Sequence, residues 1–305
     1  MEEAPKKKVT FFSKNEITCP VCGTSFKREE MFTGGGRLIA GGITPELRRL
    51  YEPSKVYGKV NPLLYPVTVC PKCYYAAFKE DFSKIKPNGI NLAKQNTERR
   101  IGIIKRIFGF LNFEENRTLK HGAASYVLAI ESYNYFDKWA SPTVKKAISS
   151  LRAAWLLSDL EVEDPMADYG DLQTLFYKKA LQFYNEVLRK QEKAEESFDG
   201  IKNLGPDTDH NYGYEGILYL IGYLTLKLSY LEKDSPQKIQ LFENAKKIVS
   251  KMVGFGKANK NKPSLIIDMA RDLYDEINQK ITELQEKLNN PQGSPVPEQP
   301  AEPNS

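Results

Sequence analysis

The chain has little cysteine and histidine for its length, with four cysteines and two histidines in 305 residues. No apolar run approaches the roughly 18 residues of a membrane-spanning helix, so we expect no membrane span. The opening stretch MEEAPKKKVTFF lacks the apolar segment of a secretory signal. A chain of this length buries a core without disulfide bonds. These absences favour a reducing cytoplasm, where paired thiols bind metal or do redox chemistry rather than cross-link.

Catalytic patterns are also lacking. The glycine-rich stretch TGGGRLIAGGIT (Thr33–Thr44) does not follow the order of a phosphate-binding loop and indicates a turn or loop. His121 and His210 have no nucleophile motif and no second histidine beside them. We therefore predict no catalytic residue and no organic cofactor, and we expect that the protein is not an enzyme, with an uncharacterised enzyme as the third functional alternative.

All four cysteines stand in two C-P-x-C pairs. Cys19 and Cys22 lie in TCPVCGTSF, and Cys70 and Cys73 lie in VTVCPKCYYAAF, with 47 residues between the pairs. Each pair follows a β-like stretch, which is typical of a knuckle, a tight turn whose backbone N–H groups point at the sulfurs. Two knuckles can supply four thiolates in a tetrahedron about 2.3 Å from Zn²⁺. We predict one structural zinc on Cys19, Cys22, Cys70 and Cys73, with a redox dithiol or an iron site as alternatives.

The character of the sequence changes near residue 88. Residues 15–85 predict a zinc-binding module after a flexible N-terminus at 1–14, and TPELRRLYEP (Thr44–Pro53) is typical of a short helix begun by Pro45. From 88 to 288, apolar residues take helical spacing, as in Ile101, Ile104, Phe108 and Leu111. Residues 289–305 are rich in proline and predict a disordered tail.

The helical segments carry a weak internal repeat. Residues recur with spacings of four and then three in three places: Ala147, Leu151 and Ala154; Ala180, Tyr184 and Val187; Lys238, Phe242 and Ala245. This spacing is typical of the second helix of a tetratricopeptide repeat, and Ile221–Gly222 matches a step of its first helix. The predicted fold class is therefore mainly α, a small zinc-ribbon-like module with four cysteine ligands followed by a tetratricopeptide-like array of α-hairpins. A generic bundle of α-hairpins is the alternative.

The last helical segment has an unbroken apolar seam. Steps of three and four residues separate Ile267, Ala270, Tyr274, Ile277, Ile281, Leu284 and Leu288. Such a seam forms a coiled coil or lets a terminal helix cap a helical array. We favour the cap.

These stretches together resemble a known family. CPVCGTSF, NPLLYPVTVCPKCYYAAF and LRAAWLLSDLE are similar to the bacterial proteins catalogued as domain of unknown function 2225, over about residues 15–250. The resemblance implies a zinc-ribbon-like front joined to tetratricopeptide-like helices, with the four cysteines as metal ligands and nothing catalytic. Many relatives have glycine after the last cysteine, where this chain has Tyr74, which implies a slightly altered second knuckle. We expect Tyr74, Tyr75 and Phe78 to pack the knuckle onto the helices, with stacking on nucleic-acid bases as the alternative.

Charge divides the chain and leaves two functions open. Residues 1–120 hold 22 Lys and Arg and 12 Asp and Glu, a net of +10, whereas residues 121–305 have a net of −5. A helical array with a groove binds peptides or helices, so we predict an adaptor with a protein partner. The alternative is nucleic-acid binding by the basic front, through Arg99, Arg100, Lys105 and Arg106.

Overall fold

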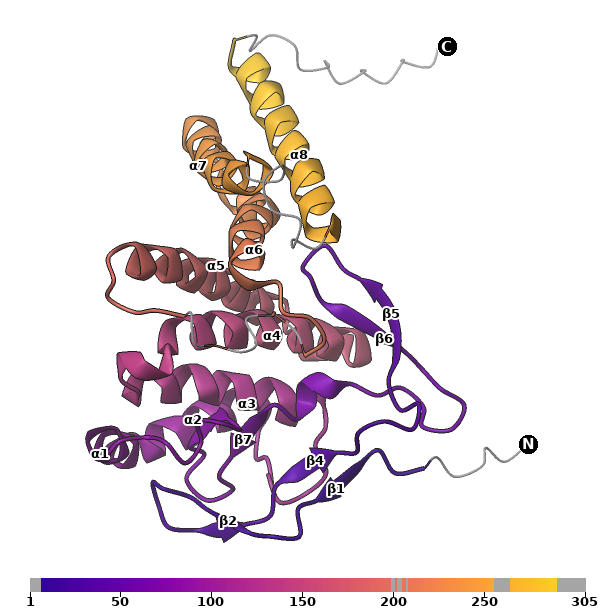
Figure 1. Cartoon of the computed structure of the whole chain (residues 1–305), viewed down its shortest axis with the longest axis vertical. Helices are drawn as coiled ribbons and strands as arrows, with labels where there is room; N and C mark the ends of the chain where they lie inside the picture. Colours follow the sequence, from indigo (N-terminus) through magenta and orange to yellow (C-terminus); the bar gives the residue numbers. More distant parts are fainter. Residues whose placement is uncertain (1–6, 199–200, 202–204, 207, 255–263, 290–305) are drawn as a thin grey trace, which may run out of the picture.

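The computed structural model describes residues 7–198, 201, 205–206, 208–254 and 264–289. Within them, small β-hairpins precede a stack of helices, which confirms the mainly α fold class (Figure 1). The strands are β1 (Thr10–Phe12), β2 (Ile17–Thr18), β3 (Ser25–Phe26), β4 (Glu29–Met31), β5 (Ile39–Ile43), β6 (Arg49–Glu52), β7 (Val67–Val69) and β8 (Ala76–Phe78). The helices are α1 (Pro87–Gln95), α2 (Thr97–Phe108), α3 (Leu119–Ser132), α4 (Pro142–Glu163), α5 (Gly170–Glu192), α6 (Gly213–Leu228), α7 (Ser235–Gly254) and α8 (Ser264–Asn289).

The strands form two-stranded antiparallel ladders that stay separate. The pairs are β1 with β4, β2 with β3, β5 with β6 and β7 with β8. Strand β1 falls inside residues 1–14, where the sequence predicts a flexible N-terminus. The predicted tail at 289–305 begins at Asn289, which is the last residue of α8, and residues 1–6 and 290–305 lie outside the described residues. Each ladder is too short to be stable alone, so the hairpins depend on what they pack against.

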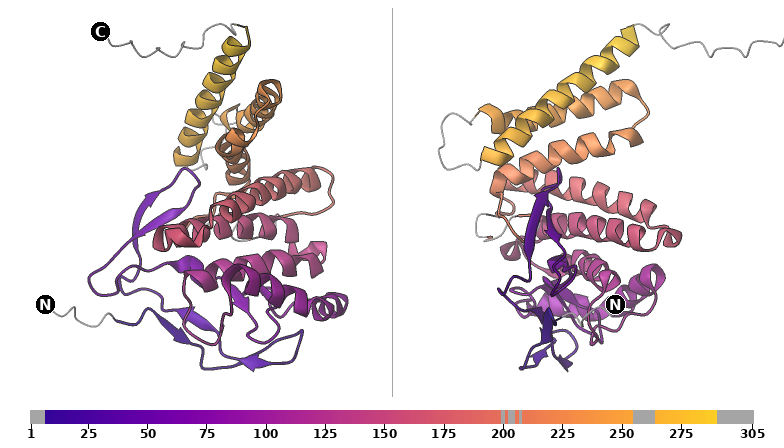
Figure 2. Two further views of the ribbon diagram at one scale, coloured as in Figure 1. Left: turned by 180° about the vertical axis from the view of Figure 1, so that it is seen from behind. Right: turned by 90° about the vertical axis from the view of Figure 1, so that its right-hand side faces the viewer.

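Successive helices pack against one another from α3 to α8 (Figure 2). On the predicted helix face, Ile104 and Phe108 of α2 are buried and Ile101 is half-buried. Leu111 is buried too, but it lies beyond the end of α2 at Phe108. The repeated triplets are buried too, except Lys238, which is half-buried. However, the first two triplets fall on α4 and α5, which are consecutive helices packed together. Those triplets therefore mark one helix pair rather than the second helices of two separate repeats.

Gly222 lets α6 approach its two neighbours closely. A Cβ atom there would lie 2.4 Å from Cγ2 of Val249 on α7 and 3.2 Å from Cδ2 of Leu273 on α8. The small residue of the Ile221–Gly222 step thus has a packing role.

Gly222→Ala is expected to destabilise the protein by about 1–3 kcal/mol, because overpacking must push α7 or α8 away. Gly102→Ala on α2 is the matched control, since a Cβ atom at Gly102 would have no neighbour within 4 Å and alanine favours a helix. Urea unfolding of both variants measures the difference. Equal midpoints for the two variants would show that the contact at Gly222 does not limit packing.

The apolar seam of α8 packs against other helices of the same chain. Ile267, Ala270, Ile277 and Ile281 are buried, and α8 packs against α7 and α6. Leu288, at the end of the seam, is exposed. Helix α8 is therefore the last layer of the stack, as the capping interpretation expects.

One hydrophobic core runs through the N-terminal β-hairpins and the helices. Leu47, Val67 and Tyr75 from the front belong to the same buried cluster as Ala124 and Trp155 from the helices. The predicted boundary at residues 85–88 separates two styles of secondary structure and stays a prediction as a domain boundary. The buried side chains continue across it.

The segment from Gly41 to Glu52 corrects two sequence-based expectations. Its second glycine cluster lies in strand β5 rather than a loop, and Thr44–Pro53 forms a turn and strand β6 rather than a helix. The turn is closed by Thr44 N–H donating to the Arg48 carbonyl, and Leu47 has a φ of 61° that no helix accepts. Distant contacts at the hairpin tip override the local helical preference.

Those contacts hold a buried carboxylate among three helices. Glu46, at the tip of the β5–β6 hairpin, accepts hydrogen bonds from Nε1 of Trp155 on α4 and from the hydroxyl of Tyr177 on α5 at 2.9 Å. Nζ of Lys227 on α6 forms an ion pair with it at 2.7 Å. Tyr219 also donates to the Pro45 carbonyl at 2.9 Å. The hairpin thus joins α4, α5 and α6 from one side (Figure 1).

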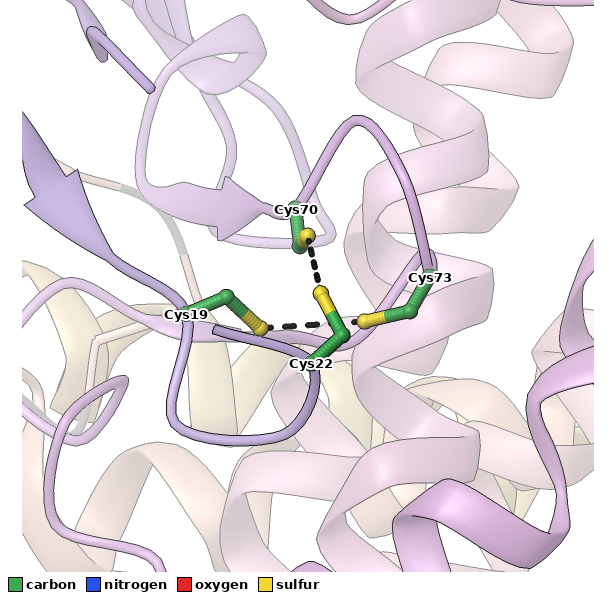
Figure 3. A group of neighbouring side chains, drawn as sticks. All are labelled: Cys19, Cys22, Cys70 and Cys73. Carbon is green, nitrogen blue, oxygen red and sulfur yellow. Dashed lines mark hydrogen bonds between the residues drawn. The ribbon is translucent and has the colours of Figure 1, made fainter. Parts of the chain in front are cut away.

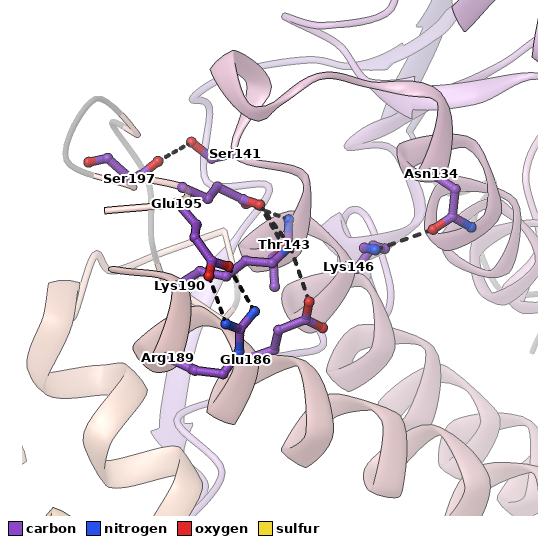
Figure 4. Close-up of polar contacts among 10 residues, drawn as sticks. Asn134, Ser141, Thr143, Lys146, Glu186, Arg189, Lys190, Glu195 and Ser197 are labelled. Carbon is purple, nitrogen blue, oxygen red and sulfur yellow. Dashed lines mark hydrogen bonds and ion pairs between the residues drawn. The ribbon is translucent and has the colours of Figure 1, made fainter. Parts of the chain in front are cut away.

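A second carboxylate closes the start of α4. The Glu196 side chain accepts hydrogen bonds from the Thr143 backbone N–H and hydroxyl, both at 2.7 Å, and pairs with Lys190 of α5 at 3.2 Å. Ser141 donates to the Ser197 carbonyl at 2.5 Å (Figure 4). An anion at a helix N-terminus is stabilising, so the chain that leaves α5 is fastened back onto α4. Thr143 is buried within this cap.

Candidate metal centre

The two cysteine pairs lie in two separate turns that have the same backbone hydrogen-bond pattern. In the first, Cys19 N–H donates to the Thr24 carbonyl at 2.9 Å and Gly23 N–H donates to the Cys19 carbonyl at 2.9 Å. In the second, Cys70 N–H donates to the Tyr75 carbonyl at 2.9 Å and Tyr74 N–H donates to the Cys70 carbonyl at 3.0 Å. Each turn joins two short strands, β2 to β3 and β7 to β8. The two predicted knuckles are therefore present with matching hydrogen bonds.

The residue after each pair adopts the left-handed conformation. Its φ is 75° for Gly23 and 55° for Tyr74. Glycine accepts this conformation freely, whereas a residue with a Cβ loses on the order of 1 kcal/mol or more. Tyr74 offsets the strain by donating its hydroxyl to the Leu111 carbonyl at 2.6 Å and by packing edge-on against Phe113. The second knuckle keeps its shape without glycine.

The two knuckles bring the four sulfurs together (Figure 3). Sγ of Cys19 lies 3.7 Å from Sγ of Cys73, and Sγ of Cys22 lies 3.5 Å from Sγ of Cys70. All four sulfurs lie within 4.8 Å of one another, and all four cysteines are free. Four ligands about 2.3 Å from a tetrahedral ion stand about 3.8 Å apart. The group could therefore hold one metal ion.

Because the sulfurs lie so close together, the pKa of one thiol is lowered and the pKa values of two others are raised. Hydrogen bonds from Cys19 and Cys73 lower the pKa of the Cys70 thiol to about 2. The hydrogen bond with Cys70 raises the pKa of Cys19 to about 12, and the pKa of Cys73 is raised by its hydrogen bonds with Cys19 and Cys70. Like charges this close cannot all ionise unless a cation compensates them. A divalent ion would remove this conflict, so the donor set fits a thiolate-binding metal.

The second knuckle is anchored directly to the helices. Arg100 of α2 is fully buried and donates to the Cys73 carbonyl from Nη2 at 3.1 Å and from Nε at 3.3 Å. Its Nη1 donates to the Ala93 carbonyl of α1 at 2.6 Å. In strand β8, Ala76 N–H donates to Ser132 Oγ at 3.2 Å and Phe78 N–H donates to the Tyr133 hydroxyl at 3.1 Å. The second knuckle is thus attached by hydrogen bonds to α1, α2 and the end of α3.

Arg100 is the supporting residue that sequence reasoning missed. The sequence places it in an exposed basic patch, and the structure corrects this placement because the side chain is buried beneath the knuckle. Arg100 precedes Ile104 by four residues and Phe108 by eight, so helical spacing alone puts it on the buried stripe. That spacing was the available signal.

Arg100→Met is expected to cost at least about 2 kcal/mol, because it removes both side-chain donors of the buried Cys73 carbonyl and one donor of the Ala93 carbonyl, which keeps the Thr97 hydroxyl. Arg99→Met is the matched control. The Arg99 side chain is 64% exposed and its ion pair with Glu131 is 3.6 Å long, so its loss should cost less than about 1 kcal/mol. Thermal unfolding and the rate of zinc loss to a chelator measure both variants. Indistinguishable behaviour of the two would mean that Arg100 does not support the knuckle.

The first knuckle has weaker attachments. Phe26 of β3 packs edge-on against Phe82 with ring centroids 5.9 Å apart. Glu29 of β4 accepts the Arg117 backbone N–H at 2.7 Å. Nζ of Lys79 forms a solvent-exposed ion pair with Oε2 of Glu30 in β4 at 3.0 Å. Exposed ion pairs contribute little to the free energy of folding. The sulfur cluster is therefore the main polar link between this knuckle and the body of the protein, beside the buried side chains of Val21 and Phe26.

The aromatic run after Cys73 packs as expected. Tyr74 and Tyr75 are buried, and Phe78 lies against Tyr126 and Tyr133 of the α3 region. Tyr75 donates to the Phe82 carbonyl at 3.1 Å. These contacts confirm packing onto the helices in place of an exposed stacking surface.

The two histidines lie apart from the sulfurs. Nδ1 of His121 is 3.0 Å from the Thr118 hydroxyl, and its Nε2 is 3.2 Å from the Asn112 carbonyl. His121 therefore forms part of the N-terminal capping box of α3. Burial lowers the pKa of His121, so its ring is neutral at physiological pH. His210 lies next to Asp209, with Nε2 3.3 Å from Oδ2.

Two comparisons place the chain among bacterial proteins. Residues 12–277 match the model of a family described as uncharacterized protein conserved in bacteria (DUF2225). An uncharacterized protein of Borreliella burgdorferi is 40% identical over 279 residues, which cover 91% of this chain and 99% of that protein. No solved structure matches significantly. Among the described residues, no helix combines the length and apolar character needed to cross a bilayer.

Proposed function

The chain belongs to this uncharacterized bacterial family, DUF2225, and from that premise we propose that it is a cytoplasmic, zinc-stabilised helical scaffold that binds another protein. We propose that the metal is zinc, that the chain catalyses no reaction and that its partner is a protein. The array of helices, with tetratricopeptide-like pairs, supplies the binding surface. The four cysteines keep the front folded onto it.

Zinc is the proposed metal on Cys19, Cys22, Cys70 and Cys73. Two C-x-x-C knuckles with four sulfurs at tetrahedral spacing support this assignment. Four thiolates fill the coordination of zinc and leave no position for water or substrate, so the centre has a structural role. A cytoplasmic location fits four free thiols.

The proposal that the protein is not an enzyme rests on the surroundings of its reactive groups. The cysteines are directed at one another, His121 caps a helix, and Thr143 is buried within a cap. None of these groups is joined to a base in an open cavity in the way that nucleophilic catalysis requires.

One observation carries the proposal of protein binding. The helices leave large apolar side chains on their outer surface, most fully Met166 and Val162 between α4 and α5. Exposed apolar side chains in a group mark interaction sites on proteins.

Nucleic-acid binding is the second candidate because the front is basic. Residues 1–120 have a net charge of +10, and Arg99, Lys105 and Arg106 are exposed on α2. With Arg100 buried, the predicted patch loses one of its four cations. The remaining cations belong to the outer face of an amphipathic helix, which carries charge in most proteins.

Affinity purification from the native bacterium, with and without nuclease, separates the two candidates. We expect a protein partner that stays bound after nuclease treatment. We also expect mixed RNA and DNA to bind weakly and to dissociate between about 50 and 200 mM salt, as non-specific phosphate attraction does. Tight nucleic-acid binding that survives the salt and disappears in the Arg99→Glu and Arg106→Glu double variant would reverse the ranking.

A further inference from the structure

Five apolar side chains are exposed on three segments in contact: the α4–α5 connection, the start of α5 and the end of α6. Among the described residues, Met166 and Val162 are the two most exposed large apolar side chains, at 92% and 80%. Leu175, Tyr230 and Leu231 are also exposed. We call these five residues the α4–α5 patch.

The elements that carry the patch are in contact. Helix α5 packs against both α4 and α6, and the short 3-10 helix Pro165–Ala167 packs on α4. The Thr174 hydroxyl of α5 lies 3.4 Å from the Tyr230 hydroxyl, just past the end of α6. The start of α5 and the end of α6 are therefore side by side at Thr174 and Tyr230.

The support beneath the patch is rigid. Arg48 of the β5–β6 hairpin pairs with Asp159 at 2.5 Å, and the Glu161 carboxylate accepts the Tyr169 backbone N–H at 2.6 Å. These contacts fix the last turn of α4 and the entry to α5. A preformed surface loses little conformational entropy on binding.

Acidic side chains flank Val162 and Met166 at the α4–α5 connection. Between Asp159 and Asp171 the sequence has six acidic residues and no Lys or Arg. Asp159 and Glu161 hold Arg48 and the Tyr169 backbone, and the other four, Glu163, Asp164, Asp168 and Asp171, are exposed. No ion pair within the described part of the chain neutralises these four carboxylates. The patch thus combines an apolar centre with a negative rim.

We propose that the α4–α5 patch docks a basic amphipathic helix of a partner protein. Leucine-type side chains on one face of that helix would cover the five apolar residues, and Lys or Arg on its flanks would meet the acidic rim. When a helix binds in this way, apolar contact supplies most of the affinity, and complementary charge raises the association rate and the selectivity. The inference rests on the proposed function, since it names the chemistry of the protein partner.

Designed peptides of about 18 residues, which form a helix about 27 Å long, test this chemistry. The first peptide places leucines on one face and lysines elsewhere. The second replaces every lysine with glutamate, and the third keeps the composition of the first but scatters the leucines. We expect the full-length protein to bind only the first peptide in fluorescence anisotropy at about 150 mM salt, where weak long-range attraction is screened.

Three variants assign the binding to the patch. Val162→Asp with Met166→Asp should weaken binding at least about tenfold, as loss of central contacts does. Because both side chains are largely exposed, this variant should fold normally, and circular dichroism checks it. Leu92→Asp, at an exposed leucine of α1, is the control and should bind as the unaltered protein does. Glu163→Lys should weaken binding of the lysine peptide and slow its association.

Four results would overturn the inference: no peptide binds, the glutamate or scattered peptide binds as well as the first, the double variant binds as the unaltered protein does, or Leu92→Asp weakens binding equally. Self-association in sedimentation that Met166→Asp abolishes would assign the patch to a second copy of this chain and also contradict it. The proposed function is tested separately by the native partner. A partner that binds the unaltered protein and the double variant equally leaves the adaptor function in place and rejects the patch.

Discussion

Loss of the metal is expected to free residues 10–31 from the rest of the protein while residues 66–78 stay attached. We expect the same result from Cys70→Ser and from a strong chelator. Structural zinc in small domains contributes on the order of 10–16 kcal/mol at neutral pH. Removal of the metal is therefore expected to destabilise the first knuckle more than the single substitutions described above.

The asymmetry follows from how the knuckles are held. The second knuckle keeps the Arg100 bonds to the Cys73 carbonyl and the bonds from β8 to Ser132 and Tyr133. Apart from the sulfurs, the first keeps the buried side chains of Val21 and Phe26, one hydrogen bond from the Arg117 backbone and an exposed ion pair. Two-stranded ladders as short as β2–β3 do not persist alone.

Hydrogen exchange measures the separation directly. Amides of residues 10–31 should lose protection on metal removal, and amides of α4 to α8 should keep it. Ser25→Ala, at an exposed serine of β3, is the matched control and should retain both metal and protection. Uniform loss of protection through α4 to α8 would show that the shared core, rather than the first knuckle, depends on the metal.

Glu46→Ala is expected to lower the free energy of unfolding by about 2–4 kcal/mol. The substitution removes the acceptor of Trp155 and Tyr177 and the partner of Lys227. Buried donors left unpaired each cost about 1–3 kcal/mol. Lys227 is 34% exposed in its side chain and can turn toward water, which keeps the loss below that of a fully buried ion pair.

Urea unfolding and hydrogen exchange check the Glu46 prediction. Amides of residues 39–52 should exchange faster, because the hairpin loses its attachment to α4, α5 and α6. Glu52→Ala, at an exposed glutamate of the same hairpin, should change the unfolding midpoint little. If the two variants were equally stable, the tip contacts would not hold the hairpin.

The cysteine cluster could be predicted because its determinants are local. Each C-P-x-C pair specifies its own turn, and the left-handed residue after each pair follows from that turn. The altered residue at Tyr74 was expected from the resemblance to the family, in which many relatives have glycine at that position. Only the meeting of the two knuckles needs the rest of the fold, and shared metal chemistry anticipates it.

The hairpin and Arg100 show where local reasoning ends. Thr44–Pro53 has helix-like composition, yet Glu46 finds partners 109, 131 and 181 residues away along the chain. No local pattern records such contacts, and tertiary contacts override weak propensity. Arg100 looked like a surface cation because charge is usually solvated, whereas two backbone carbonyls in a buried site satisfy it.

The helical repeat was predictable only in part. Spacing of four and three identified the buried faces of α4, α5 and α7, because the same spacing follows from any closely packed helix. It could not identify which helices pair. Two triplets that begin at Ala147 and Ala180 lie on neighbouring helices.

Metal analysis of freshly purified, reduced protein tests the central claim that the four cysteines hold one structural zinc. We expect native mass spectrometry to find one zinc per chain, lost in Cys70→Ser and kept in Ser25→Ala. The four thiols should resist alkylation until a chelator is added, since zinc-bound thiolates are shielded. Protein without metal, or with a stable Cys19–Cys22 or Cys70–Cys73 disulfide, would contradict the account.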